Sequence, residues 1–472
     1  MSFSKIGVSK EICNILNDKG LSRPTDVQKN CIPLIFQSLL HKFSLILDRD
    51  LFACSQTGSG KTAAFLIPII QNLVHELVPM YALILTPTRE LAHQIAEQAA
   101  GLNTVNGKNM INVLTITGGK DSVRQNMELS RNPNLVISTP GRLADLLRSN
   151  LNLENDELFN SKIEWTLKRI KVLVLDEADR LLEDNFGTDL GLIISNLPKK
   201  RQNLLFTATL TSNVRKACDT AIESANNSGK KPLVLWPPDI MIREVQSSIV
   251  DTLTQYYVIM RAEHKDAFLV QILIDFLNEN PHSLVIIFTN KCKWCHLIGL
   301  ILKKLKISNV LLHSNMPQRE RIASLTSFKS SHVRVLIATD LASRGLDIPT
   351  VDAVINHNVP LNPKEYIHRV GRTARAGKSG IAITLTDMFE VARLKNLQET
   401  IDKQLELYGV NEKEVAKIIA EVTLARREAE RDLDHINFDE KKDIEKAKRI
   451  LKRKAENKTK TEQSDASVKE KL

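Results

Sequence analysis

The sequence is poor in the features that mark secreted, membrane-spanning or disulfide-stapled proteins. Its 472 residues include six cysteines, at positions 13, 31, 54, 218, 292 and 295, and they follow no repeating spacing. This pattern excludes a disulfide scaffold and fits a reducing compartment. No apolar run reaches the roughly 18 residues that cross a bilayer, and the opening segment MSFSKIGVSKEICNIL lacks a signal-peptide layout. We therefore expect an intracellular protein without a membrane partner, long enough for two domains and an appendage.

The positive charge is concentrated near the C-terminus. Of the formal net charge of +10, residues 441–472 contribute +6, from 12 Lys or Arg and 6 Asp or Glu, which leaves +4 for residues 1–440. A basic tail of this kind is typical of an arm that binds a polyanion. A solvated, disordered terminus without any partner is the alternative interpretation.

Short, continuous apolar runs recur in two sets along the chain. They lie at 83–85, 135–137, 172–175 and 204–206, and then at 284–288, 335–337, 354–355 and 381–385. Runs without polar alternation predict strands buried on both faces, and hence parallel sheets covered by helices. We expect an α/β fold with domains at 1–229 and 251–405, a Pro-containing linker at 230–250, and a basic extension at 406–472 that passes from helix to disorder. Within that extension, 411–453 is expected to form one or two exposed helices with a break near Asn437.

The segment SQTGSGKT at 55–62 carries the strongest chemical signal. Glycines let backbone N–H groups close around phosphate oxygens at the start of a helix. Lys61 is placed to reach the β- and γ-phosphates of a nucleotide, and Thr62 to ligate Mg²⁺. A simple Gly/Ser turn is the structural alternative. The residues expected to bind ATP here are Ser55, Gln56, Thr57, Gly58, Ser59, Gly60, Lys61 and Thr62.

Two further motifs fit catalysis on a bound triphosphate. Asp176 follows the apolar run 172–175 and can hold Mg²⁺ through water, while Glu177 can polarise the attacking water. An acidic helix N-cap is the alternative. Arg372 and Arg375, three residues apart, offer planar donors that can act as arginine fingers on a γ-phosphate. A basic surface helix is the alternative for this pair.

Together these motifs resemble, in order, those of the DEAD-box ATP-dependent RNA helicases of superfamily two, over roughly residues 3–390. The resemblance implies two tandem RecA-like parallel-sheet domains followed by a helical, basic tail, with ATP and Mg²⁺ as cofactors. The Q motif falls at about 1–29 and the DEAD box at 176–179. It also implies that Phe3 stacks on adenine, that Gln28 hydrogen-bonds its edge, and that Arg23 and Asp347 contact ATP.

The resemblance also assigns residues to RNA and to coupling. The RNA-backbone contacts it implies are Arg89, Gly119, Thr139, Arg142, Gln318, Arg321, Thr339 and Gly345. Coupling of hydrolysis to unwinding is assigned to Thr207, Thr209, Asp179 and His368. Contacts to phosphates and 2′-hydroxyls hardly read base sequence, so the expected partner is RNA of little sequence preference.

Two segments depart from the usual family pattern. About ten extra residues lie between Pro33 and Arg49, and the stretch 36–47 is either a surface insertion or a gene-model error. The segment NHNVP at 356–360 lacks the more frequent Tyr-Asp pair. Together with LARREAE at 424–430 and FDEKK at 438–442, it resembles a nucleolar subgroup that acts in small-subunit ribosome assembly. This resemblance implies a nuclear, nucleolar protein with a monomeric core, pre-rRNA as a partner, and room for a protein activator.

Other functions remain open at this point. A general mRNA or ribonucleoprotein remodeller, an ATP-dependent RNA clamp and a DNA helicase share most of these motifs. The segment CKWCH at 292–296 has the letters of a haem attachment site, but such attachment needs an export route. We expect this segment to begin a helix, with Trp294 in the core.

Overall fold

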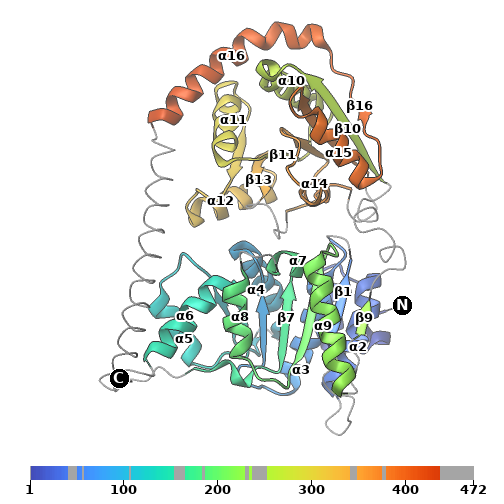
Figure 1. Cartoon of the computed structure of the whole chain (residues 1–472), viewed down its shortest axis with the longest axis vertical. Coiled ribbons are helices and arrows are strands. Elements are labelled where there is room, and N and C mark those ends of the chain that lie inside the picture. Colours follow the sequence, from blue (N-terminus) through green and yellow to red (C-terminus); the bar gives the residue numbers. More distant parts are fainter. Residues whose placement is uncertain are drawn as a thin grey trace, which may run out of the picture.

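The computed structural model is built from two α/β units in tandem, each around one seven-stranded parallel sheet (Figure 1). It describes residues 2–40, 50–55, 58–105, 108–153, 165–182, 186–228, 233–235, 252–340, 348–374 and 379–435. The predicted fold class, with two parallel-sheet domains followed by a C-terminal helix, is confirmed.

The first sheet contains all four apolar runs predicted for the first domain. Its strands, in spatial order, are β5 (Val113–Ile116), β6 (Leu135–Ser138), β2 (Ala82–Leu85), β7 (Val172–Asp176), β8 (Gln202–Thr207), β1 (Leu51–Cys54) and β9 (Leu233–Leu235). The helices and the two 3-10 helices associated with it are η1 (Phe3–Ile6), α1 (Lys10–Asp18), α2 (Asp26–Leu40), α3 (Lys61–His75), α4 (Arg89–Asn103), α5 (Ser122–Ser130), α6 (Pro140–Leu153), η2 (Leu167–Arg169), α7 (Ala178–Leu181), α8 (Gly187–Ser195) and α9 (Ser212–Ser228). A small antiparallel pair, β3 (Thr104–Val105) and β4 (Lys108–Asn109), follows α4.

The second sheet repeats the arrangement. Its strands, in spatial order, are β12 (Asn309–Leu312), β13 (Val335–Thr339), β11 (Val285–Thr289), β14 (Ala353–Asn356), β15 (Gly380–Asp387), β10 (Leu253–Met260) and β16 (Glu406–Leu407). Its helices are α10 (Lys265–Glu279), α11 (Cys292–Lys304), α12 (Gln318–Lys329), α14 (Pro363–Val370), α15 (Val391–Ile401) and α16 (Glu412–His435).

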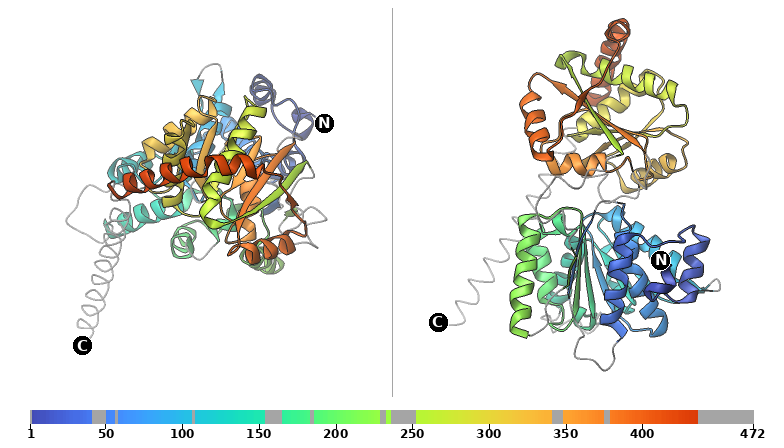
Figure 2. Two further views of the ribbon diagram at one scale, coloured as in Figure 1. Left: turned by 90° about the horizontal axis from the view of Figure 1, so that it is seen from above. Right: turned by 90° about the vertical axis from the view of Figure 1, so that its right-hand side faces the viewer.

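Burial explains why the strand sequences do not alternate. Every residue of β2, β6 and β7 is buried, as is every residue of β11 and β13, because helices cover both faces of each sheet (Figure 2). Since the pairing is parallel throughout, the carboxyl ends of the strands meet at one edge of each sheet. Polar loops that follow these strands are thereby gathered at that edge.

The boundaries of the sheets differ from those predicted. Three residues of the predicted linker form β9, which pairs in parallel with β1 and extends the first sheet to Leu235 instead of ending at 229. Residues 406 and 407, assigned to the tail, form β16 beside β10. All other residues of the predicted linker lie outside the described residues.

Helix α16 confirms the predicted helix after 411, and most of its residues are exposed as expected, but one stripe of it is buried. The apolar residues of this stripe recur every three to seven positions and pack against α10 and α11, so one face of the helix belongs to the core of the second domain (Figure 1). These buried residues are Val415, Val422, Ala425, Ala429 and Leu433. The expected break near Asn437 and the basic tail lie outside the described residues.

Part of the unusual stretch at 36–47 belongs to the fold. Helix α2 continues through it to Leu40, and Phe36 is buried in the first domain's core. A Cβ on Gly7 would stand 3.2 Å from the Phe36 ring, so the ring packs closely on the N-terminal segment. Residues 41–49 are not described.

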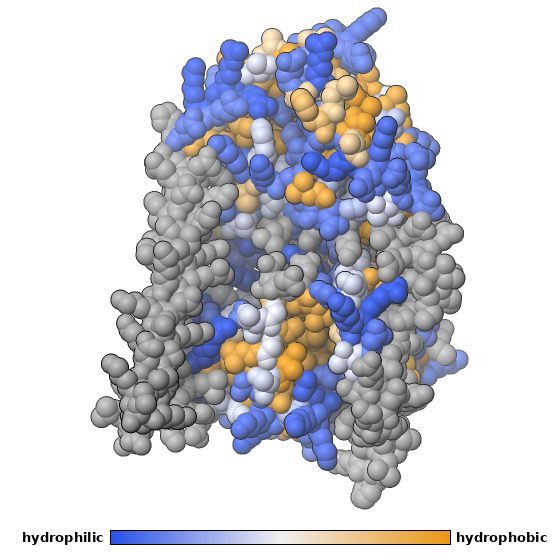
Figure 3. All heavy atoms as spheres, viewed as in Figure 1, coloured by the Kyte–Doolittle hydropathy of each residue, from blue (hydrophilic) through white to orange (hydrophobic). Residues whose placement is uncertain are grey.

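The visible surface mixes hydrophilic and hydrophobic residues (Figure 3). Within the described ranges, none of the helices combines the length and apolarity needed to pass through a bilayer.

Candidate functional site

The predicted phosphate-binding loop lies between β1 and α3. Gly58 and Gly60 have φ angles of 80° and 89°, in the left-handed region that favours glycine. The loop encloses Lys61, whose ammonium donates a hydrogen bond to the carbonyl oxygen of Ser55 at 2.6 Å. Burial lowers the pKa of Lys61, and the nearby carboxylate of Asp176 acts in the opposite direction. The loop thus holds a cation at the start of a helix, where phosphate oxygens are favoured.

Gln28 is tied directly to this loop. Its amide nitrogen donates to the carbonyl oxygen of Gly60 at 3.1 Å, and its amide oxygen accepts from the backbone N–H of Thr25 at 3.0 Å. A Cβ on Gly60 would stand 2.4 Å from Nε2 of Gln28. The Q-motif glutamine and the phosphate loop are therefore packed as one unit.

The other two residues predicted to contact the nucleotide through the Q motif lie outside the cavity described below. Phe3, expected to stack on adenine, is only 4% exposed because it packs with Ile6 in the hydrophobic core, and it does not line the cavity described below. Arg23 is exposed and does not line that cavity either.

Two carboxylates stand at the end of β7. Asp176 is buried, and burial raises its pKa to about 7, with a further contribution from the negative charge of Glu177 and an opposing one from Lys61. The backbone N–H of Glu177 donates to Oδ1 of Asp176 at 3.1 Å. Glu177 itself has a φ of 53°, a left-handed conformation that non-glycine residues rarely adopt and that is enriched at functional sites.

These groups share one cavity of about 350 Å³, to which the second domain contributes Arg372. The predicted residues lining it are Gln28, Gly58, Gly60, Lys61, Thr62, Asp176, Glu177 and Arg372. The hydroxyl of Thr62 and the carboxylate of Asp176 are oxygen ligands of the kind Mg²⁺ prefers, so the residues present fit a magnesium ion.

Sequence reasoning missed one wall of this cavity. Leu91, Gln94, Ile95 and Gln98 lie on one face of α4 and line it together with Leu21. Their spacing of three and four residues along the chain, which places them on one face of a helix, was the available signal.

The four predicted coupling residues are brought together. Thr209 donates its hydroxyl to Oδ2 of Asp179 at 2.5 Å, and Nε2 of His368 in the second domain lies 3.9 Å from the same oxygen. The hydroxyl of Thr207 donates to the carbonyl oxygen of Thr209 at 2.9 Å. All four side chains are buried. A link between the hydrolytic carboxylates and the second domain therefore runs through Asp179.

In the first domain, the predicted RNA-contact residues lie around the ends of β5 and β6. A Cβ on Gly118 would stand 2.7 Å from Nη2 of Arg89, so the paired glycines leave room for that guanidinium. Arg142 donates from Nη2 to the carbonyl oxygen of Lys120 at 2.9 Å. The backbone N–H of Thr139 donates to the carbonyl oxygen of Ile116.

In the second domain, Gln318 and Arg321 stand in the first turn of α12, and Thr339 ends β13. Arg321 forms an ion pair with Glu90 of the first domain at 2.9 Å. Four predicted RNA-contact side chains carry a buried polar atom that finds no hydrogen-bond partner within the described part of the chain. These atoms are Nε of Arg142, Nε2 of Gln318, Nε of Arg321 and Oγ1 of Thr339. Unsatisfied buried polar atoms are uncommon in folded proteins, and these four can form hydrogen bonds with a polar ligand.

Five predicted site residues lie outside the described residues: Gln56, Thr57, Gly345, Asp347 and Arg375. The CKWCH segment begins α11 at Cys292, as predicted, and Trp294 packs against the second domain's core.

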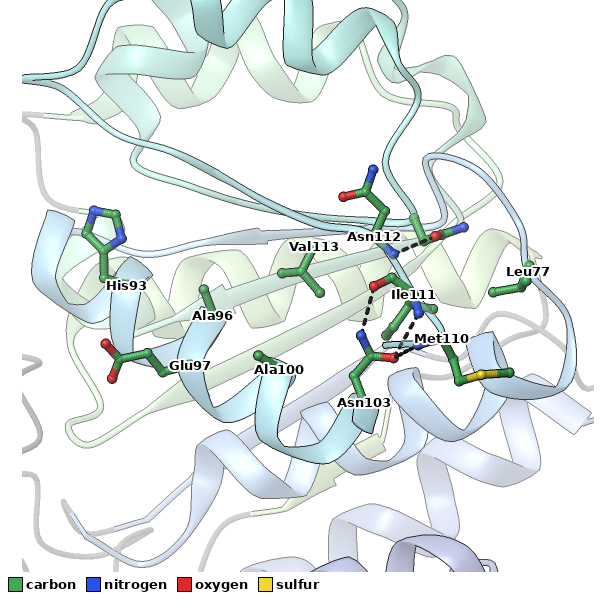
Figure 4. Close-up of a pocket in the computed structure, with 11 residues that line it drawn as sticks. Leu77, His93, Ala96, Glu97, Ala100, Asn103, Met110, Ile111, Asn112 and Val113 are labelled. Atoms are coloured by element: carbon green, nitrogen blue, oxygen red, sulfur yellow. Dashed lines mark hydrogen bonds between the residues drawn. The ribbon is translucent and has the colours of Figure 1, made fainter. Parts of the chain in front are cut away.

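A second, larger hollow of about 740 Å³ lies on the first domain between α4 and the edge strand β5 (Figure 4). It is lined by side chains such as His93 and Glu97 but by none of the predicted site residues. Asn103 directs its amide to the backbone of Ile111 through two hydrogen bonds of 2.8 Å, so these polar atoms serve the local fold.

Comparison with known proteins agrees with this geometry. Residues 25–217 match the DEAD/DEAH box helicase family, and residues 265–377 match the helicase conserved C-terminal domain. The chain is 44% identical over 452 residues to the human protein named Probable ATP-dependent RNA helicase DDX49, covering 95% of this chain and 86% of that protein. It is 42% identical to ATP-dependent RNA helicase DBP8 of Debaryomyces hansenii, covering 95% of this chain and 96% of that protein.

Solved structures with the same two-domain fold include complexes with nucleotide and RNA. S. cerevisiae Dbp5 bound to RNA and ADP BeF3 is 28% identical and has a TM-score of 0.70, and the match covers 89% of this chain and 99% of that chain. Mss116p bound to ssRNA and AMP-PNP is also 28% identical, with a TM-score of 0.70 and coverage of 89% and 81%. Because both helicase domains match in order and the similarity extends over nearly the whole sequence, this chain belongs to the DEAD-box family of ATP-dependent RNA helicases.

Proposed function

We propose that this helicase opens short RNA duplexes or remodels ribonucleoprotein during pre-rRNA processing and assembly of the small ribosomal subunit, in the nucleolus. The observation that carries the mechanism is the shared cavity, in which Lys61, Asp176 and Glu177 of the first domain meet Arg372 of the second. The ribosomal role is supported by the resemblance of the segments 356–360 and 424–430 to the nucleolar subgroup.

In the ATP site, each residue has a separate task. Lys61 exchanges its bond to the Ser55 carbonyl for oxygens of the β- and γ-phosphates. Thr62 and Asp176 would hold Mg²⁺, whose charge would offset that of the phosphates. Glu177 positions the attacking water. Arg372, with Arg375, stabilises the charge that develops on the transferred phosphoryl group.

RNA binding is proposed to use both domains at once. Arg89 and Arg142 from the first domain, and Gln318 and Arg321 from the second, contact one strand through its backbone, so that base sequence is hardly read. A strand bent along the closed domains does not remain paired in a regular duplex. The contact of Thr209 and His368 with Asp179 reports the state of the nucleotide to the second domain, and reopening after hydrolysis releases the strand.

RNA-stimulated ATP hydrolysis and strand displacement test this mechanism. Lys61→Ala should lose nucleotide binding, while Glu177→Gln should retain it and hydrolyse ATP at least about 100-fold more slowly. Full turnover in either variant contradicts the site assignment. Equal stimulation by DNA would favour a DNA helicase, and nucleotide-dependent RNA retention without displacement would favour an RNA clamp.

The cellular role has a separate test. Crosslinking of the full-length protein in cells should recover pre-rRNA, and the protein should be concentrated in the nucleolus. Recovery of mRNA in place of pre-rRNA would favour a general mRNA remodeller.

A further inference from the structure

Two segments that resemble the nucleolar subgroup, 356–360 and 424–430, meet at one buried carboxylate. Asp266, the second residue of α10, is 4% exposed. His357, from the NHNVP segment, places Nε2 at 3.1 Å from Oδ1 of Asp266. Arg426, from the LARREAE segment of α16, donates from Nη1 to Oδ2 at 2.7 Å. Each carboxylate oxygen is therefore contacted by a residue from a different one of these two segments.

Arg426 is fixed from several sides. Its guanidinium lies 5.4 Å from the centre of the Trp294 ring on α11, within the range of a cation–π contact. Its Nε donates to Glu430 one turn further along α16 at 3.0 Å. Burial alone would raise the pKa of Asp266, but the hydrogen bond and charge of His357, with the charge of Arg426, keep that pKa below its usual value. The carboxylate is thus held ionised between two partners.

From His357 the contacts continue to Arg369 on α14. Nδ1 of His357 lies 3.3 Å from the amide oxygen of Asn358. Arg369 donates to the backbone carbonyl of Asn358 at 3.1 Å and to the side chain of Asn356 at 3.3 Å. Arg369 is 1% exposed and also makes two hydrogen bonds of 2.6 Å to Asp340.

The last step joins Arg369 to the ATP cavity. The backbone N–H of Arg372 donates to the carbonyl oxygen of Arg369 at 3.1 Å, and Arg372 lines the cavity together with Glu177. An unbroken set of contacts therefore connects α16 on the outer side of the second domain with the arginine that faces the nucleotide.

We infer that Arg426, Asp266 and His357 are positioning residues for ATP hydrolysis. Through them, α16 fixes the 356–358 loop and the end of α14, which lies two residues before Arg372. The inference rests on the proposed role of Arg372. Removing one partner of a buried ion pair leaves the other charge uncompensated, so the loop relaxes, and small displacements of a group that stabilises the transition state reduce the rate. The C-terminal helix then belongs to the hydrolytic machinery as well as to the core.

Arg426→Met in the full-length protein provides the first test, because the Met side chain can keep the apolar contact with Trp294. We expect kcat for RNA-stimulated hydrolysis to fall by roughly fivefold or more while KM for ATP changes little. Arg426→Lys should recover part of kcat, since it keeps a charge for Asp266. His357→Gln, which can still donate to Asp266 but cannot reach Asn358 in the same way, should show the same loss, and the double variant should lose no more than either single one.

Lys304→Met is the matched control. Lys304 pairs α11 with Glu428 and Asp432 on the exposed side of α16, away from Asp266, so its removal weakens the attachment of the helix without touching the network. We expect wild-type kcat for this variant.

Wild-type kcat in folded Arg426→Met and His357→Gln would overturn the inference, as would an equal loss in Lys304→Met. Arg372→Ala separates this result from the proposed function. If that variant hydrolyses ATP normally, the assigned role of Arg372 fails; if it is inactive while the Arg426 and His357 variants are active, only the positioning network fails.

Discussion

Arg321 of the second domain and Glu90 of the first form a 2.9 Å ion pair, and both side chains are buried. The pair joins Arg321, a predicted RNA-contact residue, to the direct neighbour of Arg89, another predicted RNA-contact residue. It exists only where the two domains approach one another, so it reports on closure directly.

Glu90→Gln should therefore weaken RNA binding in the presence of a non-hydrolysable ATP analogue and leave nucleotide-free RNA binding unchanged. We expect the RNA-binding free energy to weaken by about 2 kcal/mol, which is roughly 30-fold in affinity, because the Arg321 charge is left buried without its partner. Fluorescence anisotropy of a labelled oligoribonucleotide measures it. Glu97→Gln, at an exposed position on the same helix, is the control. An equal loss without nucleotide would contradict a closure role.

Thr209→Val should uncouple strand displacement from hydrolysis. The change keeps the shape of the side chain and removes the 2.5 Å hydrogen bond to Asp179. Hydrogen bonds to charged groups contribute about 1.5–3 kcal/mol, so we expect about tenfold fewer duplexes opened per ATP hydrolysed. Parallel displacement and phosphate-release assays give this ratio. Thr220→Val on the exposed side of α9 serves as the control; an unchanged ratio at position 209 would remove its coupling role.

Gly60→Ala should abolish ATP binding while Gly20→Ala should not. Both glycines have positive φ angles, 89° and 74°, so each substitution introduces strain of about 1–2 kcal/mol. Only at Gly60 does the added Cβ meet another group, 2.4 Å from Nε2 of Gln28, whereas at Gly20 no heavy atom lies within 4 Å. Titration with a fluorescent ATP analogue distinguishes them. Equal loss of affinity in both variants would mean that strain alone, without the clash, accounts for the effect.

Stability should fall as the pH is lowered from about 6.5 to about 4, with a contribution from His313. Burial lowers the pKa of His313 to about 4, with smaller contributions from the charges of His296 and Arg321. Between the two pKa values the unfolded chain binds a proton that the folded protein excludes. The free energy of unfolding therefore falls by up to about 3 kcal/mol over this range, and His313 makes no contribution above pH 6.5. Guanidinium unfolding at pH 7.5, 6 and 5 measures the loss.

His313→Asn removes the titrating ring and should flatten this pH dependence. His296, whose pKa burial also lowers, should leave a smaller residual slope. An unchanged slope in the variant would assign the acid sensitivity to other groups.

The parts of the site that follow strand ends could be predicted from the sequence. Ser55, Asp176 and Thr207 each lie at the end of an apolar run or directly after it, and parallel pairing places those ends at one edge of the sheet. The meeting of Asp179 with His368 follows from the motif order of the family. In these cases a local signal was enough, because the fold supplies the long-range geometry.

Contacts that depend on side chains far apart in the sequence could not be predicted. Asp266 and Arg426 are 160 positions apart and have no local pattern that pairs them. The burial of Phe3 depends on packing within the N-terminal segment. The burial of one face of α16 depends on the apolar faces of α10 and α11, which the charge-rich composition of α16 does not reveal. A Glu- and Lys-rich helix can still present one apolar stripe.

The strands at the four margins of the two sheets are very short: β5, β9, β12 and β16 have four, three, four and two residues. A strand of that length offers few free backbone groups to a foreign chain. Keeping these edge strands short limits edge-to-edge pairing between copies of the protein when they are crowded together.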